Sequence, residues 1–174
     1  NPNDPNIQTL ICQWLGGLKT KKKCHEEVID HHMRAIKGQQ KNYFSREMET
    51  TTASNRIQYT SYDIPYTLAN DLNMEMIGRI LSTRYLESIR EREGGSYGVG
   101  VAGQMTILPK PQAVLLMQFD TDPKKQARLM EIIHEEVQTI VENGPLASDL
   151  QKEKESMLKD YQEDLEKNSY WRTA

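Results

Sequence analysis

The sequence has few cysteines, no long apolar run and no excess of charge of one sign. Its two cysteines, Cys12 and Cys24, are too few for a tetrahedral thiolate metal site and do not suggest a disulfide scaffold in a chain of 174 residues. No segment approaches the roughly 18 to 20 consecutive apolar residues of a membrane helix. The opening NPNDPN also lacks the basic and apolar regions of a signal peptide. We therefore expect no membrane span, and the compartment stays open.

The charged residues are mixed along the chain rather than gathered in blocks. The formal net charge is -3 and charged residues make up 27% of the sequence. This composition lacks the basic stripe by which proteins bind phosphate backbones, so we expect no nucleic-acid partner. The length suits one ordinary domain that buries its own core, with an additional arm.

Hydrophobic periodicity divides the chain into helices and pairs of strands. We expect helices over residues 6–18, 65–93, 123–143 and 148–168, the last beginning with a capping box of Ser148 and Gln151. We expect strands around Tyr43-Phe44, around Ile57-Tyr59, over 96–104 and over 113–119. After the first helix the order is β β α β β α α, without the strict alternation of a doubly wound sheet. The predicted fold class is α+β, a two-layer sandwich with helices packed on one face of a largely antiparallel sheet.

The glycines of Gly98-Val-Gly-Val-Ala-Gly103 fit the letter pattern GxGxxG of a dinucleotide-binding loop. That site needs a strand, then a glycine turn, then a helix whose amides meet the pyrophosphate. Here the glycines fall inside an expected strand that follows a helix and precedes another strand. Nucleotide binding is therefore disfavoured, and glycines on one face of a strand indicate instead that a helix or another backbone approaches closely there.

A tight corner between a helix and a strand lies just upstream of these glycines. The long helix ends in Ile89-Arg-Glu-Arg-Glu93 and the chain turns through Gly94-Gly95 into the strand. The corner would place the side chains of Arg90 and Tyr97 near one another, as convergent donors suited to a peptide carbonyl or a developing oxyanion. From the residues alone, the favoured interpretation is an ordinary arginine at a helix C-terminus and a half-buried tyrosine in a sheet.

The segment Arg90-Glu-Arg-Glu-Gly-Gly-Ser-Tyr97 resembles the RExxGxxY segment of the inverzincins, the zinc metallopeptidases related to pitrilysin, insulin-degrading enzyme and mitochondrial processing peptidase. The likeness extends upstream over 70–89 and downstream to the segments beginning at Phe119 and Asn143. The end, Asn168-Ser-Tyr-Trp171, is similar to that of bacterial zinc proteases of this type, and the ICQWLGGL stretch resembles the close of the family's preceding domain. Among these similarities, only the spacing of the arginine and the tyrosine is specific to the family.

The resemblance implies that this chain belongs to the C-terminal part of such an enzyme. In the family, an HxxEH helix in a distant N-terminal domain holds the zinc, and an arginine and a tyrosine of the C-terminal domain contact the peptide near the scissile bond. By resemblance these are Arg90 and Tyr97, the catalytic residues that we predict for positioning substrate and stabilising the oxyanion. The implied partners are a peptide substrate and the zinc-binding half of the same protein.

The sequence departs from the family in lacking HxxEH. Its histidine cluster, His25, His31 and His32, fits neither HxxEH nor HExxH, and its spacing is poor for ligands on one helical face. We therefore predict no metal site in this chain and no hydrolysis by the isolated chain, because a zinc-activated water and its general base are missing. Zinc in the full-length protein is what the resemblance implies. The fourth histidine, His134, falls on the polar side of an amphipathic helix and needs no special role.

The resemblance also implies a division of the chain. Residues 1–36 would be a tail helix of a preceding domain and a linker, and residues 37–174 a C-terminal inverzincin-like domain, incomplete at its C-terminus. The predicted function is to position substrate in a zinc metallopeptidase. The alternative is a non-catalytic scaffold or peptide-binding subunit of the same fold.

Overall fold

A computed structural model describes residues 5–18, 26–47, 49–92 and 98–173 of the chain, with the backbone alone for residues 90–92 and 173. The helices are α1 (Ile7–Trp14), α2 (Leu68–Tyr85), the π-helix η1 (Leu86–Arg92), α3 (Gln126–Asn143), α4 (Ala147–Asp164) and α5 (Asn168–Thr173). The strands are β1 (Ala53–Ser61), β2 (Gly100–Thr106) and β3 (Gln112–Thr121). Within these residues, none of the helices is long and apolar enough to cross a membrane.

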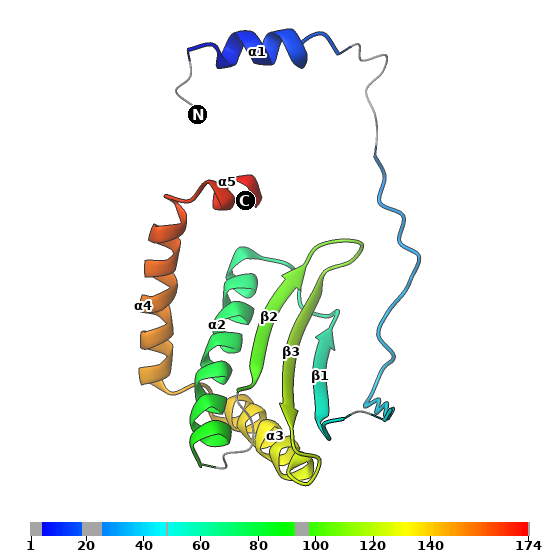
Figure 1. Ribbon diagram of the computed structural model, residues 1–174. Helices are drawn as coiled ribbons and strands as arrows, with labels where there is room; N and C mark the ends of the chain where they lie inside the picture. The colour runs from blue at the N-terminus through cyan, green and yellow to red at the C-terminus, as the bar shows by residue number, and fades with distance from the viewer. Residues whose placement is uncertain (1–4, 19–25, 48, 93–97, 174) are drawn as a thin grey trace.

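The three strands form one antiparallel sheet in the order β1-β3-β2 (Figure 1). Side chains alternate between the two faces of a strand, and the buried side chains of β3 include Leu115, Met117 and Phe119. They pack with Leu81 and Tyr85 of α2 and with residues of α3, so the helices cover one face of the sheet. The α+β prediction is therefore confirmed.

Local signals in the sequence account for two of the helix ends. The Thr67 hydroxyl accepts the backbone N–H of Asn70 at 3.1 Å, which caps the first turn of α2. The second end is the C-terminus of α3. There Gly144 has φ 73°, a left-handed conformation that glycine adopts without a steric penalty. Both ends thus lie close to where the sequence predicts them.

The backbones of α2 and β2 approach so closely that only glycine fits on both sides. A Cβ added to Gly103 would lie 1.9 Å from the carbonyl oxygen of Met74, and one added to Gly78 would lie 2.7 Å from the backbone nitrogen of Gly103. One turn away, the backbone N–H of Met105 donates to the carboxylate of Asp71 at 3.1 Å. The close approach expected from the glycines of this strand is present, and α2 also satisfies an N–H of this edge strand.

Three local predictions are wrong. Residues 39–47 contain no strand: Tyr43 and Phe44 are 80% and 94% exposed, and β propensity without a pairing partner does not make a strand. The capping box is absent, since α4 begins at Ala147 and the Ser148 hydroxyl contacts its neighbour Asp149 at 3.4 Å. The last long helix ends at Asp164, and α5 follows as a separate helix.

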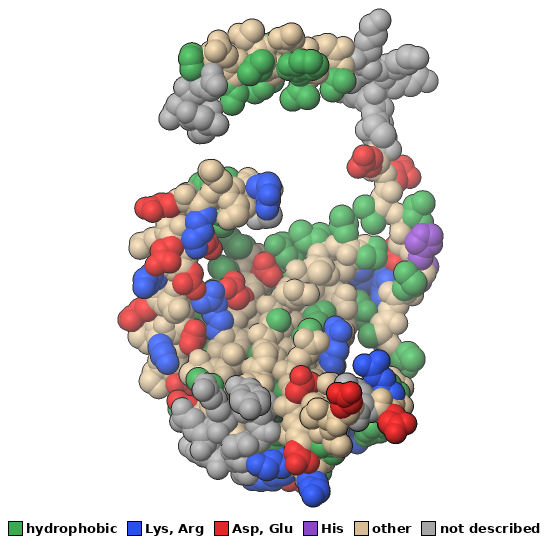
Figure 2. Space-filling view, in the orientation of Figure 1, with side chains coloured by type: hydrophobic (Ala, Val, Ile, Leu, Met, Phe, Trp, Pro, Cys, Tyr) green, Lys and Arg blue, Asp and Glu red, His purple; other side chains and the backbone are tan. Residues whose placement is uncertain are grey.

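The helix α4 packs on α2, and polar side chains join the two helices. Arg79 pairs with Asp160 at 2.6 Å, and the Thr83 hydroxyl donates to Glu153 at 3.3 Å. Apolar side chains of α4 are about half exposed, with Leu158 and Tyr161 at 56% and 52%. Figure 2 shows charged side chains of both signs spread over this part of the surface.

The first helix, α1, lies apart from the sheet (Figure 1). Its apolar side chains gather along one side of the helix (Figure 2), and Leu10, Trp14 and Leu15 are 46%, 71% and 61% exposed. The predicted division between residues 1–36 and 37–174 is compatible with this arrangement and stays a prediction. The end of α1 at Trp14, just before Gly16-Gly17, agrees with the expected helix.

Because α2 and β2 are in such close contact, we expect alanine to destabilise the protein much more at Gly103 than at Gly100 of the same strand. Gly103→Ala should lower the free energy of unfolding by about 1 to 3 kcal/mol or more, because the added carbon meets a backbone oxygen that cannot turn aside. Gly100→Ala is the control, since its nearest atom, the carbonyl oxygen of Gln118, would lie 3.8 Å away. Urea unfolding of both variants measures the difference, and equal losses would show that the contact is not close in solution.

Because Tyr85 is buried, we expect the protein to lose stability at high pH. Its side chain is fully buried and its hydroxyl donates to the carbonyl of Ile133 at 3.0 Å, and burial raises the pKa of the phenol above its ordinary value. A raised folded pKa favours the neutral form, so the stabilisation is complete below about pH 10, the unfolded pKa, and is lost as pH rises above it. In urea titrations from pH 8 to 11, Tyr85→Phe should start about 1 kcal/mol lower and fall less steeply. Parallel curves for the two proteins would contradict this.

Candidate functional site

The corner that carries the predicted site residues begins where α2 changes into a π-helix. Residues 86–92 continue the helix predicted to reach position 93, but with the wider π geometry rather than the 3.6-residue period. Short π-helical turns inside α-helices are uncommon and occur often at functional sites. Arg90 lies in this turn, at the end of the helix that leads towards β2.

The structure locates the two predicted catalytic residues only in part. The backbone of Arg90 belongs to η1, but its side chain is not described. Tyr97 lies outside the described residues, directly before Gly98. Their roles therefore remain predictions.

Buried contacts hold the helical side of this corner in place. Ile89 is fully buried in the core beside Tyr85, and the Ser88 hydroxyl donates to the carbonyl of Arg84 at 2.9 Å. The guanidinium of Arg84 in turn pairs with Glu136 of α3 at 2.7 Å. Arg84 lies in the last turn of α2, and nothing in the local sequence indicates that it would pair with α3.

A hollow of about 510 Å³ lies at the end of the sheet next to Gly98. The described residues that line it come from β1, β3 and the approach to β2: Ser54, Asn55, Arg56, Gly98, Gln118, Phe119 and Asp120. Gly98 directly follows Tyr97, so the hollow adjoins the predicted substrate-binding segment along the chain. Sequence reasoning missed this hollow, because its walls come from strands that are distant in the sequence.

The register of the sheet places Arg56 on the face opposite the helices. Arg56 is opposite Gln118 on β3, and Gln118 is opposite Gly100 on β2. Their neighbours Ile57 and Met117 face the core, so the side chains of Arg56 and Gln118 point away from it. Arg56 could have drawn attention in the sequence as a charged residue next to an apolar one in a predicted strand.

The histidine cluster does not form a metal site in the described residues. His31 and His32 are exposed in an extended segment, and His25 is outside the described residues. The nearby carboxylate of Asp30 is occupied by Arg34, whose hydrogen bond, with help from the N–H of His32, lowers the pKa of Asp30 to about 2. Within the described segments, no three potential ligand side chains gather in a way that could hold a metal. These residues do not fit a zinc ion.

His134 has a specific contact that the sequence did not indicate. Its Nδ1 lies 2.7 Å from the hydroxyl of Tyr59, and the two rings meet edge to face. This pair joins α3 to β1, and burial raises the pKa of the Tyr59 phenol. The contact is structural and adds no group to the hollow.

The glycine pattern does not have the surroundings of a dinucleotide loop. Gly100 and Gly103 lie within β2, and β3 follows where a phosphate-binding loop would continue into a helix. The order of helix, strand and strand expected for this region is therefore confirmed.

Comparison with known proteins identifies the family. The family model described as the peptidase M16 inactive domain matches residues 3–157. No curated protein and no solved structure matches the chain. The matched range includes every strand of the sheet, the corner at η1 and most of α4. The chain therefore belongs to the peptidase M16 family of pitrilysin-like proteins, in the part of it described as the inactive domain.

Proposed function

We propose that this chain is the substrate-positioning C-terminal domain of a zinc-dependent metallopeptidase that cleaves peptides. The observation that carries the proposal is the corner at η1, where a π-helical turn holds Arg90 in a segment with the spacing RExxGxxY. Membership of the peptidase M16 family supports the same assignment. The zinc motif would lie in another part of the protein, because the described residues of this chain do not fit the ion.

Each of the two residues has a distinct chemical role in this proposal. The guanidinium of Arg90 would donate hydrogen bonds to a substrate carbonyl and hold the peptide in register. The hydroxyl of Tyr97 would donate to the oxygen that becomes negatively charged in the tetrahedral intermediate. Donors of this kind contribute about 2 to 4 kcal/mol each when they are preorganised. The metal, bound elsewhere, would supply the activated water.

The buried contacts before the corner support a fixed geometry. Tyr85 and Ile89 are fully buried, and they anchor the end of α2 and the start of η1 in the core. A donor on a rigid element costs little reorganisation when charge develops on the substrate. The hollow lined by Gly98, the residue that directly follows Tyr97 in the sequence, would supply room for a bound peptide.

The word inactive in the family description favours a second function, a non-catalytic scaffold or peptide-binding subunit of the same fold. The corner and the hollow could bind an extended peptide without cleaving it. Zinc content and peptide hydrolysis by the full-length protein separate the two functions.

The proposal predicts that both residues affect turnover in the full-length protein. Arg90→Ala and Tyr97→Phe should each lower kcat/KM for a quenched fluorescent peptide by tenfold or more, about 1.4 kcal/mol per decade, at unchanged zinc content. If Tyr97 stabilises the oxyanion, Tyr97→Phe should act mainly on kcat.

Two exposed positions provide matched controls. Tyr43 is 80% exposed and Arg128 lies on the surface of α3, paired with Glu131 at 3.3 Å. Tyr43→Phe and Arg128→Ala should leave the kinetics unchanged. Unchanged kinetics in Arg90→Ala and Tyr97→Phe would reduce both residues to structural roles, and a full-length protein without zinc or activity would favour the scaffold.

A further inference from the structure

The face of the sheet that the helices leave uncovered carries its side chains in rows across the strands. One row runs from Arg56 on β1 through Gln118 on β3 to Gly100 on β2. The next row contains Ser54 opposite Asp120. The hollow of about 510 Å³ described above lies at the end of this face where β1 begins and β3 ends.

The side of the hollow formed by the start of β2 is bare. A Cβ added to Gly98 would have no atom within 4 Å, and one added to Gly100 would come no closer than 3.8 Å to another atom. These two glycines are therefore not required by close packing, in contrast to Gly103. Their lack of side chains leaves space beside the polar groups of β1 and β3.

Arg56 is the cation of the hollow and has no partner within the described part of the chain. Arg34, Arg79 and Arg84 each pair with a carboxylate, whereas the side chain of Arg56 makes no ion pair or hydrogen bond with the described residues. The side chain is exposed and stands beside the amide of Gln118. A guanidinium fork next to an amide donor matches the two oxygens of a carboxylate.

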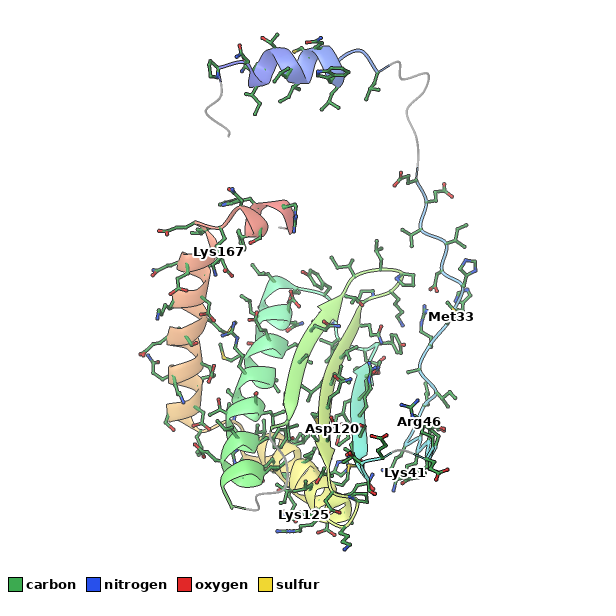
Figure 3. All side chains as sticks on the ribbon, viewed as in Figure 1. Met33, Lys41, Arg46, Asp120, Lys125 and Lys167 are labelled. Carbon is green, nitrogen blue, oxygen red and sulfur yellow. The ribbon has the colours of Figure 1, made fainter. Side chains whose placement is uncertain are left out.

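The one carboxylate among the described lining residues is Asp120, which lies near the end of β3 (Figure 3). It stands one row from Arg56 on the neighbouring strand and has an interaction of its own. Its charge opposes the entry of an anion on its side of the hollow. An anion is therefore expected beside Arg56 and Gln118, with Asp120 weakening its binding.

We infer that this hollow is a specificity subsite in which Arg56, with Gln118, binds the carboxylate of an acidic side chain of the bound peptide. The inference rests on the proposed function, because it takes the peptide to lie along the corner at Gly98. Gly98 and Gly100 leave room for the side chain, Arg56 supplies the charge, and Asp120 limits the strength of the interaction. The subsite selects among peptides and takes no part in the chemical step.

The experiment uses the full-length protein and a set of peptides that differ at a single position. In each peptide one glutamine is replaced by glutamate, and the position is scanned along the sequence. Dissociation constants are measured by fluorescence anisotropy on a zinc-depleted sample, and kcat/KM is measured separately on the zinc-loaded protein. Binding is thus measured independently of cleavage.

At one position of the scan, the unsubstituted protein should bind the glutamate peptide about three to five times more tightly than the glutamine peptide. That ratio is the size expected of an ion pair at an exposed site, and it should shrink at higher salt. Arg56→Gln should abolish the preference without changing the affinity for the glutamine peptide. Asp120→Asn should increase the preference, because it removes the opposing charge.

Arg128→Gln is the matched control, since it removes an exposed arginine from the layer of helices on the other face of the sheet. It should leave the preference unchanged, and thermal unfolding should confirm that all variants fold. Equal binding of glutamate and glutamine peptides at every position, or a preference that survives Arg56→Gln, would overturn the inference. Absence of hydrolysis with the preference intact would overturn the peptidase function alone. If the unsubstituted protein shows no preference for glutamate but its turnover depends on Arg90 and Tyr97, the subsite alone is overturned.

Discussion

The close approach of α2 to β2 is the contact on which the rest of the structure depends. Gly78 and Gly103 meet backbone to backbone, and a side chain on either would force the two elements apart. This contact fixes the line along which α2 crosses the sheet. The same helix carries Leu81 and Tyr85 into the core of the domain. Arg90 lies in η1, directly after this helix.

The two faces of the sheet differ in burial and polarity. The face under α2 and α3 carries the core, in which Tyr85, Met117 and Ile133 are fully buried. The other face carries polar residues, and it is hollowed where β2 begins with glycine. Under the proposed function, this division would let one layer hold the geometry rigid while the other faces the peptide. A functional surface can then vary in charge without disturbing the packing beneath it.

Much of the fold could be predicted from the sequence, because the main elements carry strong periodicity. The apolar stripe of α3, the buried run of β3 and the stop at Gly144 are local signals, and the structure places them close to the expected positions. The errors concern segments whose state depends on a partner. Tyr43 and Phe44 have high β propensity, but no strand pairs with them. Helix α4 contacts α2 through the pairs Arg79–Asp160 and Thr83–Glu153, which join residues far apart in the sequence.

The candidate site divides in the same way. The sequence by itself determined the family resemblance, the spacing of Arg90 and Tyr97 and the helix-to-strand corner, since all of these lie within one short stretch of chain. Only the tertiary structure decided that α2 gives way to a π-helix, that Gly78 is the partner of Gly103, and that Arg56 shares a hollow with Gln118 and Asp120. The physical reason is sequence separation. Local patterns specify helices, strands and turns, but strand register and helix docking bring together residues from distant segments, and no local pattern encodes those contacts.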